Sequence, residues 1–351
     1  MSVSQNSLTT NFPNGLTSMG VFTMGVGGLP FFTGNYFFVN PATGSDGGDG
    51  SAVSPFQTLY YALSQCVSGN NDCVVLIGNG EASGSARLSK ALAQTYNPAA
   101  TAGTLNWNKD ATHLWGVCAP TMVAQRARIA PPSGTYTQAT FGSGNFVVVT
   151  GNGCSFGNFS LFNGFSTGGT NQICWTDNGN RNAYQNVDFG GIGDAASAAD
   201  TGSRSLKVGA AGSGENTFYG CTFGLDTVTR SVANASVELA GGTPRNAFIN
   251  CQFIMDASAN SPLHILGTGA DCIDRVNRFR ECEFYNAINS GATTINEVLS
   301  FTNASPGGLV SFKSCTTVGA TKWGDTNGLA NSYVDGGAPT AASTGLAVNP
   351  S

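Results

Sequence analysis

Phe248-Ile-Asn-Cys251-Gln-Phe253 is one copy of a pattern, Phe-x-x-Cys-x-Phe, that returns along the second half of the chain. Other copies are complete, as in 218–223 and 279–284, or weakened, as in 312–317. The fourth position of successive copies falls at Phe159, Val187, Cys221, Cys251, Cys282 and Cys315. Neighbouring copies lie 28 to 34 residues apart. A near-constant period of this size predicts a repeat architecture whose loops vary in length.

Each copy alternates apolar and polar residues, since Gln252 separates Cys251 from Phe253. Alternation of this kind predicts a strand with one buried face. A second apolar run precedes most copies, at 146–150, 172–176, 205–208, 236–239 and 298–301. An antiparallel sandwich would show hairpins instead. We therefore predict an all-β chain folded as a right-handed, single-stranded parallel β-helix, whose six or seven coils at ~4.8 Å spacing make a column of about 30 Å.

The chain has 10 cysteines, four of which hold equivalent positions in successive copies. This spacing indicates a buried stack of reduced thiols rather than a disulfide framework. Cys66 and Cys73 are close enough in sequence to bridge, but Cys73 opens an apolar run that is typical of a core strand. No Cys-x-x-Cys occurs, so we expect no zinc site. We also expect no other metal and no cofactor.

Charged residues make up only 10% of the chain, and the formal net charge is -5. Proteins that bind nucleic acid need a basic surface, so we expect no nucleic acid partner. The apolar stretch 21–32 is broken by glycine and proline and is too short to span a bilayer. The N-terminus also lacks the basic start of a signal peptide. We expect no membrane partner and synthesis in a bacterial cytoplasm.

Residues 1–45 contain no Lys, Arg, Asp or Glu. A charge-free segment with many apolar side chains is better suited to lie along a surface than to extend into water. That surface is either its own β-helix or a neighbouring subunit or assembly, and we predict the second. The predicted docking side chains are Phe12, Leu16, Met19, Phe22, Met24, Leu29, Phe31 and Phe32.

We divide the chain into a docking arm at 1–45, the β-helix at 46–323 and a C-terminal extension at 324–351. A capping helix is predicted near 55–67, with Ser54 as N-cap, Pro55 in the first turn and Gln57 completing a capping box. It would cover the open end of the column, which otherwise exposes strand edges. Asp46 and Asp49 in the preceding loop lack the further carboxylates of a defined calcium site.

Catalysis would need carboxylates that converge across a groove, ~5–9 Å apart in a glycoside hydrolase. The densest acidic stretch contains Asp271, Asp274, Glu281 and Glu283, interleaved with arginines. Glu283 is predicted to face outward and could line a surface groove, but we favour the simpler interpretation that this stretch is a solvated face of mutually screened charges. His113 and His264 have no ligand or nucleophile pattern around them, and the tryptophans fall mostly in core-like strands. We predict no catalytic residue.

The stretch Gly34–Val39, followed by Thr43-Gly-Ser-Asp46, Asp49-Gly50 and Pro55-Phe-Gln-Thr-Leu59, resembles the opening of pectate-lyase-like β-helix proteins. The preceding Asn11–Ser18, with Gly28-Leu-Pro30, resembles the arm of tailed-bacteriophage virion proteins of this size. Together these resemblances cover about residues 11–80. They imply a virion structural protein with this fold, and they supply no catalytic motif.

From this resemblance and the uncharged arm we expect a non-enzymatic protein of the phage head, a capsid decoration or cement protein. Its partners would be the major capsid protein and two further copies of itself in a homotrimer, with a weak glycan contact on the outer face. The alternative is a tailspike that binds or cleaves host surface polysaccharide. A host-side or secreted lyase is a third reading.

Overall fold

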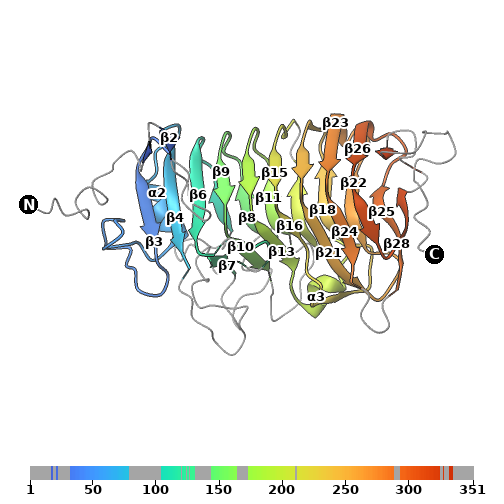
Figure 1. Ribbon diagram of the computed structural model, residues 1–351, viewed down its shortest axis with the longest axis horizontal. Helices are drawn as coiled ribbons and strands as arrows, with labels where there is room; N and C mark the ends of the chain where they lie inside the picture. Colours follow the sequence, from blue (N-terminus) through green and yellow to red (C-terminus); the bar gives the residue numbers. More distant parts are fainter. Residues whose placement is uncertain are drawn as a thin grey trace, which may run out of the picture.

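The strands expected from the repeat pair side by side into three long parallel sheets (Figure 1). The computed structural model describes residues 17–18, 21–22, 32–78, 104–119, 121–123, 125, 127–130, 144–163, 173–209, 212–287, 293–324, 327 and 332–334. From residue 105 onward, the chain passes in each coil through sheet 1, then sheet 2, then sheet 3, and rises to the next coil. The prediction of an all-β, right-handed parallel β-helix is confirmed.

Sheet 1 receives the strand that opens each coil. Its strands are β5 (Leu105–Trp107), β8 (Asn145–Val149), β11 (Ile173–Asp177), β14 (Arg204–Val208), β18 (Ala235–Ala240), β22 (Leu263–Thr268), β25 (Ile295–Phe301) and β28 (Ala320–Gly324). Five of these runs were expected from the sequence, whereas β22 was overlooked. Its apolar residues Leu263, Ile265 and Leu266 are buried in register with β18.

Sheet 2 follows, and its strands stand side by side along the column in Figure 1. They are β3 (Tyr36–Val39), β4 (Asp72–Ile77), β6 (Thr112–Val117), β9 (Ser155–Gly157), β12 (Ala183–Gln185), β15 (Thr217–Tyr219), β20 (Ala247–Ile249), β23 (Ile273–Arg280), β26 (Gly307–Lys313) and β29 (Ser332–Val334), with β19 (Thr243–Pro244) beside β23. The first halves of the Phe-x-x-Cys-x-Phe copies form this sheet.

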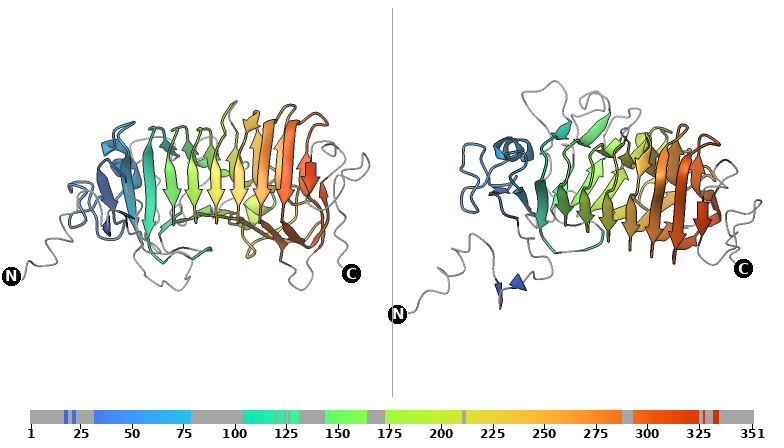
Figure 2. Two further views of the ribbon diagram at one scale, coloured as in Figure 1. Left: turned by 45° about the horizontal axis from the view of Figure 1, so that its top comes forward. Right: turned by 90° about the horizontal axis from the view of Figure 1, so that it is seen from above.

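Sheet 3 contains the second half of each copy. Its strands are β7 (Arg128–Ile129), β10 (Ser160–Asn163), β13 (Asp188–Ile192), β16 (Thr222–Phe223), β21 (Gln252–Ala257), β24 (Glu283–Asn286) and β27 (Thr316–Val318), with β17 (Thr229–Arg230) beside β21. A short helix, α3 (Ala195–Ala198), follows β13. Figure 2 shows the resulting column from two further sides, and sheet 2 extends from its first described strand, β3, to its last, β29.

From β9 onward, the corner between sheets 2 and 3 is made by a single residue in each coil. That residue adopts a positive φ, which costs least for glycine and little for asparagine. The corner residues are Asn158, Asn186, Gly220, Asn250, Glu281 and Ser314, with φ from 52° to 59°. This position is the second x of Phe-x-x-Cys-x-Phe. The residues before it end a strand of sheet 2, and the residues after it lead into a strand of sheet 3.

The interior of the column is a stack of like side chains. Phe248 lies between Phe218 and Phe279, with ring centroids 4.6 Å apart on both sides. Behind these rings, the predicted ladder positions Phe159, Val187, Cys221, Cys251 and Cys282 are buried, while Cys315 at the C-terminal end is half-buried. Cys251 donates its thiol to the Phe218 carbonyl, at 3.4 Å, and burial raises the pKa of this thiol well above its usual value. All 10 cysteines are free.

The helix at the N-terminal end is α2 (Leu59–Gln65), so the predicted start at Pro55 is wrong. The Asp46 carboxylate accepts from the backbone of Gln57 and Thr58 and from the Thr58 hydroxyl, all within 2.9 Å, and Thr58 becomes the N-cap. Lys109 supports the other end by donating to the carbonyls of Leu63 and Ser64. Leu59 and Leu63 join the core cluster, so α2 covers the end of the column as expected (Figure 1).

Both predicted domain boundaries need correction. Strand β3 lies inside the segment assigned to the arm, yet it pairs in register with β4 because Val39 completes the core of the first coil. Strand β29 lies in the predicted C-terminal extension and pairs with β26. The β-helix therefore begins at Tyr36 and includes Ser332–Val334. Among the described residues, no helix is long and apolar enough to cross a membrane.

Of the arm, the structure describes the backbone of β1 (Thr17–Ser18) and β2 (Val21–Phe22), which pair antiparallel. Phe32 is the one predicted docking side chain that is described, and it packs on the column itself. Its ring stacks on His113 at 3.9 Å and contacts the cluster of Cys73, Val75 and Trp115. The other predicted docking side chains, Phe12, Leu16, Met19, Phe22, Met24, Leu29 and Phe31, lie outside the described residues.

Candidate functional site

A polar row crosses the outer face of sheet 3, one residue from each coil. It is formed by the residue that separates Cys from Phe in each copy, which points outward because its neighbours point inward. The row runs Arg128, Ser160, Asp188, Thr222, Gln252, Glu283 and Thr316, each in register with the next. The sequence contained this row, but only Glu283 was interpreted as an outward-facing position.

The first four members of this row are buried, although they face outward. Part of the chain that connects β6 to β7 lies across them. The Thr222 hydroxyl donates to the Met122 carbonyl at 3.0 Å, and the Gln125 amide donates to the Asn186 carbonyl at 2.8 Å. Gln252 and Glu283 are half-buried and Thr316 is exposed. The row is therefore covered toward the N-terminal end and open toward the C-terminal end.

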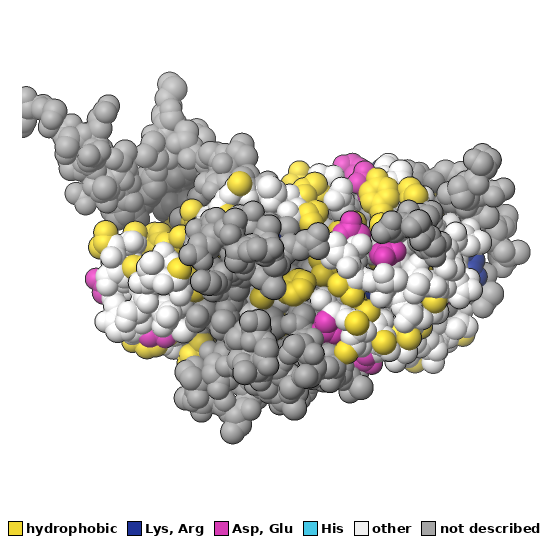
Figure 3. All heavy atoms as spheres, turned by 90° about the horizontal axis from the view of Figure 1, so that it is seen from below, with side chains coloured by type: hydrophobic (Ala, Val, Ile, Leu, Met, Phe, Trp, Pro, Cys, Tyr) yellow, Lys and Arg dark blue, Asp and Glu magenta, His cyan; other side chains and the backbone are white. Residues whose placement is uncertain are grey.

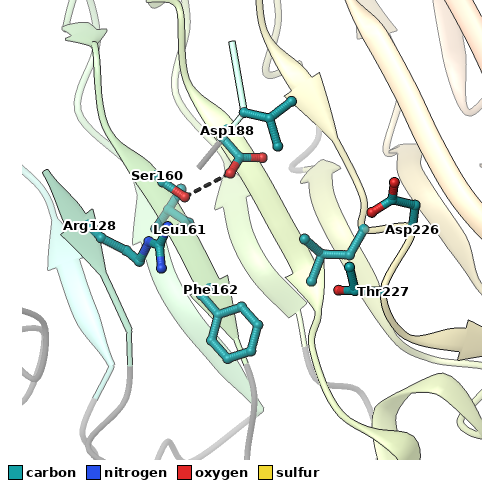
Figure 4. A pocket seen from close by; sticks show the side chains of 9 residues that line it. Arg128, Ser160, Leu161, Phe162, Asp188, Asp226 and Thr227 are labelled. Atoms are coloured by element: carbon teal, nitrogen blue, oxygen red, sulfur yellow. Dashed lines mark hydrogen bonds between the residues drawn. The ribbon is translucent and has the colours of Figure 1, made fainter. Parts of the chain in front are cut away.

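A pocket of about 170 Å³ lies where the covering segment meets the loop after β16 (Figure 4). Ser160 and Asp188 are joined at its back wall by a hydrogen bond of 2.7 Å from the hydroxyl to the carboxylate. Asp226 lines the opposite side. Small-molecule sites usually measure about 300–1,000 Å³. This pocket is too small to enclose a sugar chain, and much of its wall is apolar, from Val123, Leu161, Phe162 and Leu225.

The face of the molecule seen from below carries scattered acidic and hydrophobic side chains, with basic ones visible only toward the C-terminal end (Figure 3).

Glu283 accepts a hydrogen bond from Gln252 at 3.0 Å. Three strand spacings of ~4.8 Å separate Glu283 from Asp188, or about 14 Å, which exceeds the distance within a hydrolase pair. Glu283 and Asp188 therefore do not form a catalytic pair.

The other acidic candidates are exposed and pair loosely with their sequence neighbours. Asp274 lies 3.6 Å from Arg275, and Glu281 lies 3.6 Å from Arg280. Exposed pairs of this kind contribute about 0–1 kcal/mol. Asp271 is exposed as well. These residues form a solvated surface, in line with the simpler interpretation of the acidic stretch.

The strongest ion network lies on sheet 1 and was not anticipated. Glu238 is buried and accepts from Arg204 at 2.7 Å and from Lys207 at 3.0 Å. Burial raises the pKa of the Glu238 carboxyl, but the two cations outweigh it and hold the pKa below its usual range. The Arg204 guanidinium also donates to the backbone carbonyls of Thr201 and Ser203. With its charges paired and covered, this network has a structural role.

The two histidines are core residues. His113 accepts a hydrogen bond from the Ser155 backbone at 3.0 Å, and burial lowers its pKa to about 4. All four tryptophans are at most 8% exposed, so they do not form a sugar-stacking platform. Among the described residues, no three His, Cys, Asp or Glu side chains converge as a metal site requires. The Asp46 and Asp49 carboxylates accept backbone hydrogen bonds within their own loop and from the start of α2.

Replacing His264 by leucine should make the protein less sensitive to acid. His264 is fully buried, its ring lies against Phe253 and Phe284, and neither ring nitrogen has a hydrogen-bond partner. Burial, and then the charge of Arg230, lower its pKa well below 6.5. The unfolded chain takes up this proton below about pH 6.5 and the native chain does not, so stability falls as the pH falls, by up to about 1.4 kcal/mol per pH unit.

Urea unfolding at pH 7.5, 6 and 5 measures this difference. The wild-type free energy of unfolding should fall more steeply than that of His264→Leu. His113 titrates in both proteins, so the difference between the two curves isolates His264. Parallel curves would contradict the assignment.

Several solved structures resemble this chain in fold, and those named below act on polysaccharides. A pectin methylesterase in complex with a hexasaccharide is 12% identical, with a TM-score of 0.53 over 88% of this chain and 91% of that chain. A rhamnogalacturonan lyase is 16% identical over 82% of this chain and 74% of that chain (TM-score 0.44). For a pectin methylesterase from Erwinia chrysanthemi the identity is 10% over 88% and 91% (TM-score 0.43).

The first of these similarities supports the right-handed parallel β-helix fold and shows nothing about activity. No protein-family model matches the chain, and no curated protein sequence matches it.

Proposed function

We propose that this chain is a non-enzymatic capsid decoration or cement protein of a tailed bacteriophage, attached to the outer head surface through its N-terminal arm. The observation that carries the proposal is the complete absence of charged residues from 1–45. Protein interfaces deplete charge at their centres, and a segment of this composition is suited to that environment. The partners would be the major capsid protein and, in a homotrimer, two further copies of this chain.

The place where the arm joins the column supports this proposal. Phe32 lies within the uncharged segment, just before β3, and packs against His113 and the Cys73, Val75 and Trp115 cluster. The Tyr36 hydroxyl accepts from the Phe32 backbone at 2.6 Å and fixes the turn into β3. If the preceding residues bind a capsid, these contacts would hold the first coils of the column in a fixed position on it.

Deleting residues 2–31 should abolish attachment to heads that lack the protein, while the β-helix stays folded because Phe32 and β3 remain. Attachment is measured as bound copies per particle by quantitative mass spectrometry after sedimentation. We expect hundreds of copies for the full chain and at least about a tenfold loss for the deletion. Deleting residues 336–351 is the matched control and should leave binding unchanged. A deletion variant of 2–31 that binds at full occupancy would refute attachment through the arm.

The alternative is a tailspike that cleaves host polysaccharide, and the specific observation in its favour is that Asp188 and Asp226 line one pocket. Incubation with capsular polysaccharide and lipopolysaccharide should release no oligosaccharide if the chain is non-enzymatic. Release that is lost in Asp188→Asn or Asp226→Asn, and retained in Glu283→Gln, would favour the tailspike. A handful of copies per particle would point the same way.

A further inference from the structure

Charge changes sign across the edge where sheet 2 turns into sheet 3 in the C-terminal half of the column. Figure 1 shows the strands concerned, β23, β24 and β26. On the sheet 2 side, Arg280 lies directly beside Lys313, and both are exposed. Glu281 is the corner residue itself. On the sheet 3 side, Glu283 is the first outward-facing residue after the corner and lies beside Thr316. One side of this edge is therefore basic and the other acidic.

The cations of the basic side are poorly compensated within the chain. Arg278 adds a third positive charge to the same face of β23. Like charges placed beside each other in a sheet are destabilising. Among the described residues, Arg278 and Lys313 have no ion-pair partner, and Arg280 has only the exposed contact with Glu281 at 3.6 Å. Carboxylates supplied from outside the chain would relieve this repulsion.

Both sides of the edge also carry exposed apolar side chains. On sheet 2, Tyr219 is 49% exposed and belongs to the same row as Arg280. On sheet 3, Val318 is 48% exposed and lies beside the half-buried Tyr285. Single exposed apolar residues are normal on a monomer. Tyrosine and arginine, however, are two of the residue types in which protein interfaces are enriched.

The acidic side is accessible only in this half of the described column. Farther toward the N-terminal end, sheet 3 is covered by the connection between β6 and β7. Thr222 and the Asn186 carbonyl are the two points where Met122 and Gln125 of that connection are held. Glu283 lies beyond this cover and is half-buried. A partner thus reaches sheet 3 at the same coils where the basic side is exposed.

We propose that this edge is the contact between copies of the chain, with the basic side of one column packed against the acidic side of the next. In parallel columns at equal height, Arg280 and Lys313 meet Glu283 of the partner subunit. A second copy is the occupant that the charges favour, because it brings the acidic side to the height of the basic side. A contact between two different faces repeats from copy to copy and closes into a ring. That the ring holds three copies rests on the homotrimer of the proposed function.

Sedimentation velocity of the purified chain, without phage heads, tests this contact. One edge of a small column is a small interface, so the measurement covers about 1–100 µM. The wild type should associate within this range. Arg280→Glu and Glu283→Arg should each weaken association by at least about tenfold. An equimolar mixture of the two variants should associate again, because each variant supplies the face that the other lacks.

Arg181→Glu is the matched control. It reverses an exposed cation at a different edge of the column, where Arg181 pairs with Glu215. This variant should associate as the wild type does, and circular dichroism should show that all variants are folded. A wild type that stays monomeric at about 100 µM would overturn the proposal. So would unchanged association of Arg280→Glu and Glu283→Arg, or an equal loss in Arg181→Glu.

Deleting residues 2–31 separates this inference from attachment to the head. The contact lies in the C-terminal half of the column, so the deletion variant should self-associate as the full chain does even though it no longer binds heads. Self-association that is lost with the arm would overturn the proposal and assign the contact to the arm. A deletion variant that still binds heads, but whose association depends on Arg280, would refute attachment through the arm and leave the contact between copies standing.

Discussion

Replacing Phe248 by alanine is expected to lower the free energy of unfolding by about 3–5 kcal/mol, the usual cost of removing a large buried aromatic side chain. Its ring is fully buried between Phe218 and Phe279, both at 4.6 Å, and also meets Phe223 edge-on at 5.7 Å. The backbone of β20 is held on both sides by its neighbours, so the coils cannot collapse into the gap. Urea unfolding followed by circular dichroism measures the loss.

The neighbouring residue supplies the control. Ile249 lies in the same strand but faces outward and is half-buried. Ile249→Ala should therefore cost much less than Phe248→Ala, and Phe248→Leu should fall between the two. Similar losses for Phe248→Ala and Ile249→Ala would show that strand propensity, and not the aromatic stack, limits stability.

Replacing Asn246 by alanine is the second large effect that we expect, at about 2–4 kcal/mol, because buried polar groups would lose their partners. Asn246 belongs to a row of buried asparagines at the entry to sheet 2. Its side-chain oxygen accepts from the Asn216 backbone at 3.0 Å, and its amide donates to Asn277 at 2.9 Å. The Asn182 backbone in turn donates to the side chain of Asn216, at 2.8 Å.

Asn246→Asp separates the two halves of this interaction. Aspartate keeps the acceptor for the Asn216 backbone but loses the amide that donates to Asn277. Burial disfavours the ionised form of the new carboxyl in the folded chain only. The loss of folding free energy should therefore grow as the pH rises through and above the range where a free carboxyl ionises. Gln185→Ala, on the exposed face of β12, should change stability by less than about 0.5 kcal/mol. An Asn246→Ala loss as small as that of Gln185→Ala would contradict the role of the row.

Much of the fold could be read from the sequence because the buried side chains repeat. The apolar positions of Phe248, Cys251 and Phe253 recur with a fixed spacing, and such a pattern is readable without knowledge of loop structure. The asparagine row was equally regular, two residues before Tyr184, Phe218, Phe248 and Phe279, yet it was overlooked. Polar residues near glycine suggest turns, so their burial was not expected.

Other features depend on contacts between distant segments. The helix begins at Leu59 because Asp46, from an earlier loop, caps Thr58, and no local pattern reports that contact. The pocket forms where the connection after β6 reaches the loop after β16, and nothing in either segment indicates the other. In the sequence, Arg278 and Arg280 stand out only because they alternate with acidic residues, and Lys313 lies more than 30 residues away. Only the register of β23 with β26 shows that they share one face.

The register of the stacked rows has a consequence for how the column varies in length. Asn216 and Asn246, Phe218 and Phe248, and Cys221 and Cys251 occupy equivalent places in adjacent coils. Removing residues 217–246 would join Asn216 directly to Ala247 and keep the asparagine, phenylalanine and cysteine rows in register, but it would also remove Glu238, the partner of buried Arg204. The number of coils can therefore change by duplication or loss without disturbing these three rows, provided that the charges on sheet 1 stay paired.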